Sequence, residues 1–169
     1  SKRAVEFIGN VTAGPDATDE ARFEQGRSLT LIGFLLMRDE QDVPALATFQ
    51  HALMVLKPLI AHEPMRQRAS VMFSECASWT AEVMMKLQQI TESRAMLAEA
   101  MPIIDAAVER EAGNLGALRS RALLQGNKTR LAREANDDAT VVKLGLKVAE
   151  DWTEFLRYDP ENDTARNNR

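Results

Sequence analysis

Few residues of this chain have the types and spacings from which catalytic or metal sites are built. The two histidines, His51 and His62, lie 11 positions apart and lack the His-Glu-x-x-His frame of a zinc-protease helix. Cys76 is the single cysteine, so an internal disulfide and a cysteine metal cluster are excluded, and we expect it to pack as a small apolar residue. These patterns predict no catalytic residues, no metal site and no cofactor, so the chain is not expected to be an enzyme.

Three acids near the C-terminus, Asp159, Glu161 and Asp163, have the alternate spacing with which a calcium loop opens. The glycine and the distal glutamate of such a loop are missing. We therefore expect a turn at Pro160 in which the acids cap the following helix.

A predicted helix over residues 115–135 is rich in cations. These cations are Arg119, Arg121, Lys128, Arg130 and Arg133. Guanidinium groups bind carboxylate and phosphate in bidentate fashion. Two interpretations stay open: a solvated helix face, partly neutralised by Glu134, and an electropositive face that holds an anion, an acidic peptide or a small molecule.

The composition is that of one folded, helix-rich domain, with 169 residues of which 45% are hydrophobic and 27% charged. A formal net charge of −4 argues against nucleic acid as a partner. The apolar run 29–37 is far shorter than the roughly 20 residues that span a bilayer, so we predict no membrane insertion. This run is apolar all round, which fits either burial or a hydrophobic groove.

Apolar residues recur at helical spacing between short polar connections. One stripe comprises Leu46, Phe49, Leu53, Leu56 and Ile60, which follow one another by 3 or 4 residues. We expect helices near 17–38, 43–62, 65–89, 92–111, 115–135 and 138–158, with a seventh starting near 161. Pro58 and Pro102 fall inside predicted helices, and each should bend or end its helix.

A short motif recurs at a fixed interval of 48 positions. It occurs as Pro64–Ala69, Ala112–Ala117 and Pro160–Ala165, with a fainter copy at Asp16–Ala21. A fixed period of about 20–50 residues is typical of a stacked repeat array. We therefore predict that Ala21, Ala69 and Ala117 share one buried helix-crossing position, and that Ala165 in the incomplete last copy is less constrained.

The predicted organisation is a lead-in segment, 1–15, followed by a single domain, 16–169. Short connections make neighbouring helices antiparallel, which gives hairpins at 16–62, 64–111 and 112–158 and the start of another at 160–169. The predicted fold class is all-α, with about six or seven helices stacked as a short α-solenoid. Because the chain begins without Met and stops just after a new motif, we expect it to be a piece of a longer protein.

The first hairpin resembles a tetratricopeptide repeat. That family has a small residue in its first helix, and two alanines flanking an aromatic in its second, so that the helices approach closely. The matching residues here are Gly33 after Ile32, then Leu36, Ala45, Phe49 and Ala52. The second hairpin keeps Ala81, Met84, Leu97 and Ala100, whereas the third matches poorly. The period of 48 positions also exceeds the 34 of the family.

The longer repeat, with residues 159–162 closing one helix and Ala165-Arg166 opening the next, looks like the helical tails of membrane-anchored bacterial serine/threonine kinases. That resemblance implies a sensing or docking domain within a larger bacterial signalling protein. It would be periplasmic if the chain is such a tail, and otherwise cytoplasmic.

In tetratricopeptide arrays the first helix of each hairpin lines a concave groove. The matching positions here are Arg27, Thr30, Phe34, Met37 and Arg38, then Glu75, Ser78, Glu82, Met85 and Lys86, then Arg130, Arg133 and Glu134. The resemblance therefore implies a scaffold that binds a protein or peptide in this groove. Two other functions stay open: structural self-association into a homo-oligomer, and anion or small-molecule binding at the arginines of the third hairpin.

Overall fold

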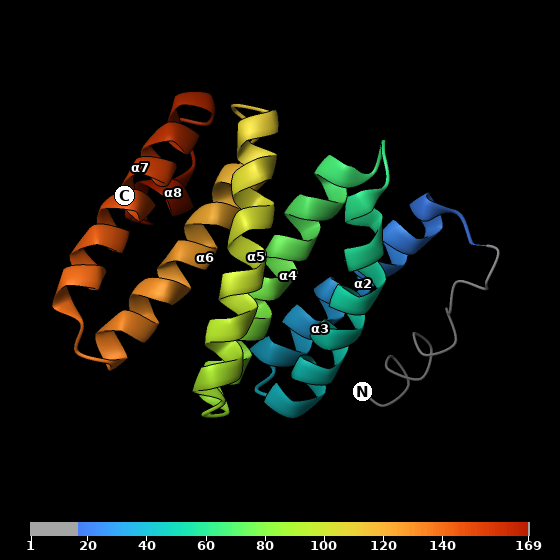
Figure 1. Cartoon of the computed structure of the whole chain (residues 1–169), viewed down its shortest axis with the longest axis horizontal. Coiled ribbons are helices and arrows are strands. Elements are labelled where there is room, and N and C mark those ends of the chain that lie inside the picture. The colour runs from blue at the N-terminus through green and yellow to red at the C-terminus, as the bar shows by residue number, and fades with distance from the viewer. Residues whose placement is uncertain (1–16, 169) are drawn as a thin grey trace.

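The computed structural model describes residues 17–168, and the predicted lead-in, 1–15, lies outside them. The described part forms seven α-helices and one short 3-10 helix (Figure 1). They are α2 (Asp19–Arg38), α3 (Asp42–Leu56), η1 (Lys57–Ala61), α4 (Arg66–Lys86), α5 (Ile90–Arg110), α6 (Leu115–Glu134), α7 (Asp138–Tyr158) and α8 (Asp163–Asn168). The predictions of an all-α fold and of antiparallel neighbours are confirmed. The expected bounds hold to within three residues except in the helix predicted over 43–62, where α3 ends at Leu56 and η1 continues to Ala61.

The helices pack in two rows (Figure 1). In one row α4 lies between α2 and α6 and contacts both of them. In the other row α3 contacts α2 and α4, and α5 contacts α4 and α6. The last long helix, α7, packs on α6, and the short α8 packs on α7.

Three of the four motif alanines lie in the first turn of a helix that is capped by the side chain three residues earlier. The cap oxygens accept the alanine N–H groups, Thr18 from Ala21 (3.2 Å), Asn114 from Ala117 (2.9 Å) and Asn162 from Ala165 (3.0 Å). Each cap satisfies a backbone donor that the helix leaves unpaired. The remaining motif alanine, Ala69, lies in α4, which begins after Met65 without a side-chain cap. Pro64 therefore precedes the N-cap rather than opening the helix.

The burial of these alanines corrects the prediction in two places. Ala69 and Ala117 are fully buried, as expected. Ala21 is exposed. Among the described helices, α2 stands at the end of its row and has a neighbour in that row, α4, on one side only. Ala165 was expected to be less constrained than the other alanines but is fully buried, because α8 folds back onto an apolar cluster between α6 and α7.

The three inter-helix turns within the hairpins share one backbone geometry. Their left-handed residues are Glu40, Gln88 and Asn136, with φ of 57°, 60° and 55°. The next N–H donates back across the turn, from Gln41 to the Leu36 carbonyl (2.9 Å), from Gln89 to Met84 (2.8 Å) and from Asp137 to Ala132 (3.0 Å). This is the Schellman helix end, in which glycine usually takes the left-handed position.

Replacing Gln88 by glycine should stabilise the protein by about 0.5–1 kcal/mol, because glycine adopts positive φ without the Cβ strain. The matched change at Asn136 should stabilise less, because asparagine tolerates this conformation better than other non-glycine residues. Urea unfolding of both variants measures the difference. A Gln88→Gly variant less stable than the wild type would show that its left-handed turn carries no strain.

The two prolines inside predicted helices behave differently. At Pro58 the α-helix has already ended at Leu56 and the chain continues as η1, so this prediction is confirmed. At Pro102, α5 continues without a break from Ile90 to Arg110. Pro102 lies on an exposed side of α5, where water can satisfy the carbonyl that loses its helical partner.

Two glycines of α2 lie close against α3 in the first hairpin, Gly26 against Leu56 and Gly33 against Phe49. A Cβ placed on Gly33 would lie 2.6 Å from the Cδ1 and Cε1 atoms of the Phe49 ring. Phe49 is fully buried between Ala45 and Ala52, which are fully buried as well. The expectation that a small residue and an aromatic ring set this helix spacing is confirmed.

The stretch Asp42–Ala61 is the one segment among the described residues that has the length and apolar composition of a membrane span, with a mean hydropathy of 1.3. The prediction of no membrane insertion was based on residues 29–37 and did not consider it. In the structure its apolar face forms part of the interior, because α3 and η1 pack against α2 and α4.

Candidate functional site

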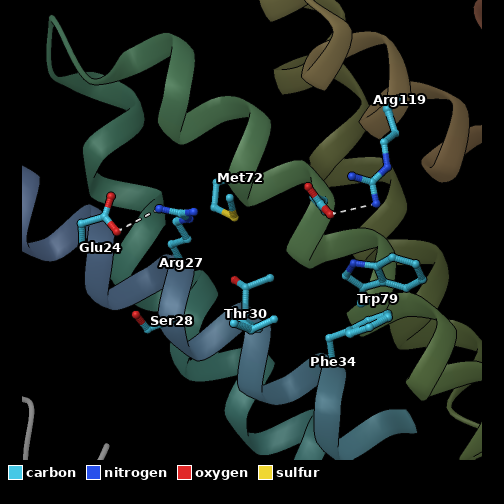
Figure 2. A pocket seen from close by; sticks show the side chains of 10 residues that line it. Glu24, Arg27, Ser28, Thr30, Phe34, Met72, Trp79 and Arg119 are labelled. Carbon is cyan, nitrogen blue, oxygen red and sulfur yellow. Dashed lines mark hydrogen bonds and ion pairs between the residues drawn. The ribbon is translucent and has the colours of Figure 1, made fainter. Parts of the chain in front are cut away.

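An open pocket of about 410 Å³ lies between α2, α4 and α6 (Figure 2). It is lined by Glu24, Arg27, Ser28, Thr30, Leu31, Phe34, Met72, Glu75, Trp79 and Arg119. We call it the α2–α4–α6 pocket. Its place on the row of first helices is the place where the groove was predicted.

Two aromatic rings form the apolar part of this pocket. The centroids of Phe34 and Trp79 lie 5.2 Å apart, with the ring planes inclined by 57°. Both side chains are half-buried, so each keeps an accessible face. Met72 lies on the same side of α4 as Trp79, two turns earlier, and adds a flexible apolar contact. An apolar or aromatic side chain of a ligand fits such a surface.

Two ion pairs border the pocket, and Figure 2 shows their arginines at opposite ends of it. Arg27 Nη1 lies 3.3 Å from Glu24 Oε2, and Arg119 Nη2 lies 3.4 Å from Glu75 Oε1. Both arginines are about half exposed, and exposed pairs of this kind contribute only about 0–1 kcal/mol. A ligand can therefore replace either partner at little cost, and the border offers both charges.

The structure brings four of the predicted groove residues together: Arg27, Thr30, Phe34 and Glu75. It places the others elsewhere. Met37, Ser78 and Met85 are buried in the helix interfaces, and Ser78 accepts hydrogen bonds from Asn127. The other predicted residues do not line the pocket: Arg38, Glu82, Lys86, Arg130, Arg133 and Glu134. Arg38 lies over the Phe34 ring, 5.9 Å from its centroid, and Lys86 pairs with Asp42.

The pocket also has lining residues that the predicted groove did not include: Glu24, Ser28, Leu31, Met72, Trp79 and Arg119. Of these, Arg119 was a candidate only as one of the cations of the basic helix. On α4 the tetratricopeptide resemblance placed Ser78, Glu82 and Met85 in the groove. The helix instead presents Met72, Glu75 and Trp79 to the pocket. The spacing of 3 and 4 residues around Glu75 was the available signal, because these positions share one helix face. The contribution of Arg119 from the third hairpin depends on long-range packing and has no local signal.

Most cations of the basic helix, α6, are paired across or along helices. Arg119 pairs with Glu75 as described, Arg130 lies 3.6 Å from Glu134, and Arg121 binds Asp151 of α7. Among the residues that the structure describes, Lys128 and Arg133 have no such partner. The cations of α6 therefore differ in environment: three of the five are paired with carboxylates of the described chain and two are not.

The Arg121–Asp151 pair is the most buried ion pair of the described chain. Arg121 Nε lies 3.0 Å from Asp151 Oδ1 and 3.2 Å from Oδ2, and only 5% of the Asp151 side chain is exposed. Burial raises the pKa of Asp151, although hydrogen bonds from Arg121 favour its ionised form. We assign this pair to the structure of the α6–α7 hairpin rather than to a binding site.

The other chemistry-bearing residues occupy structural positions. Cys76 is fully buried, as expected, and burial raises the pKa of its thiol to about 12. His62 Nδ1 lies 2.9 Å from Asp19 Oδ2 on the surface. At the C-terminal turn the helix cap is Asn162, not one of the acids as predicted, and Asp159 accepts a hydrogen bond from the Asn162 amide.

No protein-family model matches the chain, and comparisons with curated proteins and with solved structures give no match either. The function therefore has to be argued from the pocket and the surfaces of this chain.

Proposed function

We propose that α2–α3, α4–α5 and α6–α7 are successive copies of one tetratricopeptide-like unit, stacked as a short α-solenoid with a period of 48 positions. The second helices begin at residues 42, 90 and 138. The left-handed turn residues follow the same interval, at 40, 88 and 136. Equal intervals in helix starts and in backbone geometry support a structural repeat, as does the two-row packing.

We also propose that the chain is a non-catalytic interaction or sensor module that binds a peptide or protein segment in the α2–α4–α6 pocket. The observation that carries this proposal is the pair of accessible rings, Phe34 and Trp79, bordered by two weakly held ion pairs. Clustered aromatic and arginine side chains are typical of residues that dominate binding energy.

In this proposal a large apolar side chain of the partner is the anchor. It contacts Phe34, Trp79 and Met72, which removes apolar surface from water. Charged groups of the partner that flank this anchor form ion pairs with the pocket border. Acidic groups bind Arg27 or Arg119, and basic groups bind the carboxylates of Glu24 or Glu75. The anchor provides affinity, and the exchange of ion pairs provides selectivity.

Peptides selected on the wild-type domain from a displayed random library should lose roughly thirtyfold in affinity on the double variant Arg27→Ala plus Phe34→Ala. That factor corresponds to a loss of about 2 kcal/mol, as expected for an aromatic anchor contact. Fluorescence anisotropy of the labelled peptides measures it.

The matched control is Leu35→Ala, because Leu35 is on the same helix, is 57% exposed and does not line the pocket. This control should bind the selected peptides as the wild type does. If the double variant keeps a native circular-dichroism spectrum and unchanged affinity, the pocket is not the binding site.

A second candidate function, structural self-association, is favoured by a different observation. Val142 and Leu146, one turn apart on α7, are 63% and 62% exposed. An exposed aliphatic pair on the last long helix suits contact with another copy. Light scattering over a concentration series tests it, and a monomer whose mass does not change with concentration argues against it.

The resemblance to kinase tails, and with it a bacterial signalling role and a periplasmic location, remains a prediction. A kinase domain and a membrane span encoded upstream in the same reading frame would support all three.

A further inference from the structure

A second groove, of about 360 Å³, lies where α5 and α7 flank α6. Its apolar surface comes from leucines and alanines of all three helices, Leu97, Ala98, Leu131, Ala132, Ala135 and Leu144. Leu97 and Leu131 are buried at its base, and Leu144 is half-buried at its α7 side. We call it the α5–α6–α7 groove. It is separate from the α2–α4–α6 pocket and shares no lining residue with it.

The walls of this groove carry two cations, Arg94 and Lys128. Neither makes a hydrogen bond or an ion pair with any described residue. The same holds for Lys143 and Lys147, which lie one and two turns after Thr140 and therefore on the groove side of α7. By contrast, Arg119, Arg121 and Arg130 of α6 all have carboxylate partners, and Arg133, which has none among the described residues, does not line the groove.

One acid, Asp137, lines the groove, but its carboxylate is already bound at the start of α7. Its Oδ1 accepts the Thr140 N–H at 3.1 Å, and hydrogen bonds from Thr140 hold the pKa of Asp137 below its usual range. The carboxylate is therefore committed to capping α7. Asp137 nevertheless stays ionised, so the lining combines apolar surface with two cations and one carboxylate, a net charge of +1 (two minus one) in a chain whose formal net charge is −4.

We propose that the α5–α6–α7 groove is a second binding site, for an acidic amphipathic helix of a partner protein. The apolar face of that helix contacts Leu144, Ala98 and Ala135 above the floor of the groove, and its carboxylates pair with Arg94 and Lys128. Such a ligand suits both features of the groove, because an apolar ligand leaves the cations unpaired and a small anion leaves Ala98, Ala135 and the half-buried Leu144 in water. A helix laid in a groove satisfies both.

Two synthetic helical peptides of about 15 residues, or four turns, test the proposal. They share one leucine pattern and carry either Glu or Lys at all polar positions. The Glu peptide should bind the wild-type chain more tightly than the Lys peptide, and added salt should weaken its binding. Its affinity should fall roughly tenfold on Arg94→Glu plus Lys128→Glu, since two exposed pairs are worth about 1–2 kcal/mol together.

The control variant is Lys57→Glu plus Arg110→Glu, which makes the same charge change at exposed cations outside the groove and should leave the affinity unchanged. Backbone amide shifts on binding should centre on α5, α6 and the start of α7. The proposal is overturned if the two peptides bind equally, if the control weakens binding as much as the groove variant, or if anionic lipid vesicles bind the groove and the Glu peptide does not. Because Arg27 and Phe34 are untouched, failure here is distinguishable from failure of the first pocket.

Discussion

Replacing Arg121 by alanine is expected to lower the free energy of unfolding by about 3–5 kcal/mol, the typical loss when one partner of a buried ion pair is removed. The variant leaves the Asp151 carboxylate, of which 5% is exposed, without its guanidinium partner. Chemical denaturation followed by circular dichroism measures the loss. The matched surface change, Arg130→Ala, removes an exposed pair with Glu134 and should cost no more than about 0.5 kcal/mol.

The pH dependence of this variant gives an independent check. A carboxyl whose pKa is raised in the folded state binds its proton more tightly there, so its charge costs stability above that pKa. The cost shrinks as the pH falls through the folded-state pKa and is gone below the pKa of the unfolded state. Burial already raises the pKa of Asp151, and losing Arg121 removes the largest opposing influence. The deficit of Arg121→Ala should therefore be greatest near neutral pH and shrink as the pH falls. A deficit independent of pH would contradict a buried, charged Asp151.

Replacing Gly33 by alanine is expected to lower the free energy of unfolding by about 1–3 kcal/mol, although alanine is the better helix former. The new methyl would lie 2.6 Å from the Phe49 ring, and that ring is enclosed by fully buried neighbours and cannot turn aside. Thermal and urea unfolding measure the change.

Gly126 of α6 provides the control for Gly33. A Cβ there would meet no atom within 4 Å, so Gly126→Ala should stabilise the protein by about 0.5–1 kcal/mol through helix propensity alone. The same substitution in two helices is thus expected to act with opposite sign. Stabilisation at both sites would show that α2 and α3 are not held together by the Gly33–Phe49 contact.

A double variant, Gly33→Ala with Phe49→Leu, connects this contact to the proposed repeat. Ala81 and Leu97 occupy the equivalent places one period after Gly33 and Phe49, and both are buried. If the second hairpin repeats the first, alanine and leucine form a compatible pair at this crossing. The double variant should then recover part of the stability that Gly33→Ala loses, because the smaller side chain makes room for the methyl.

The helices could be predicted from the sequence because their determinants are local. Apolar residues at a spacing of three and four indicate each helix, and short polar connections make neighbours antiparallel. The bounds are therefore correct to within three residues, except that α3 ends at Leu56 rather than at 62. The helix end before Pro58 has an equally local cause, because the proline ring removes a backbone donor.

The candidate sites could be predicted only in part, because they depend on how each helix is rotated and on which helices meet. The rotation of α4 brings Trp79 rather than Ser78 to the pocket. The pairing of Arg121 with Asp151 joins positions 30 residues apart and has no signal in local spacing. Local spacing also cannot show that Arg94 and Lys128 lack ion-pair partners among the described residues, because that depends on which carboxylates the other helices place near them.

The uneven burial along the chain has a consequence for hydrogen exchange. Helix α4 has twelve buried residues, whereas α7, of equal length, has three, all in its C-terminal half. Local opening costs least where few buried contacts must be broken, so amides in the first half of α7 should exchange long before those of α4. That half includes Thr140 and Leu144 of the α5–α6–α7 groove. A ligand bound there would slow exchange in α7 and so couple occupancy of the groove to the order of the last hairpin.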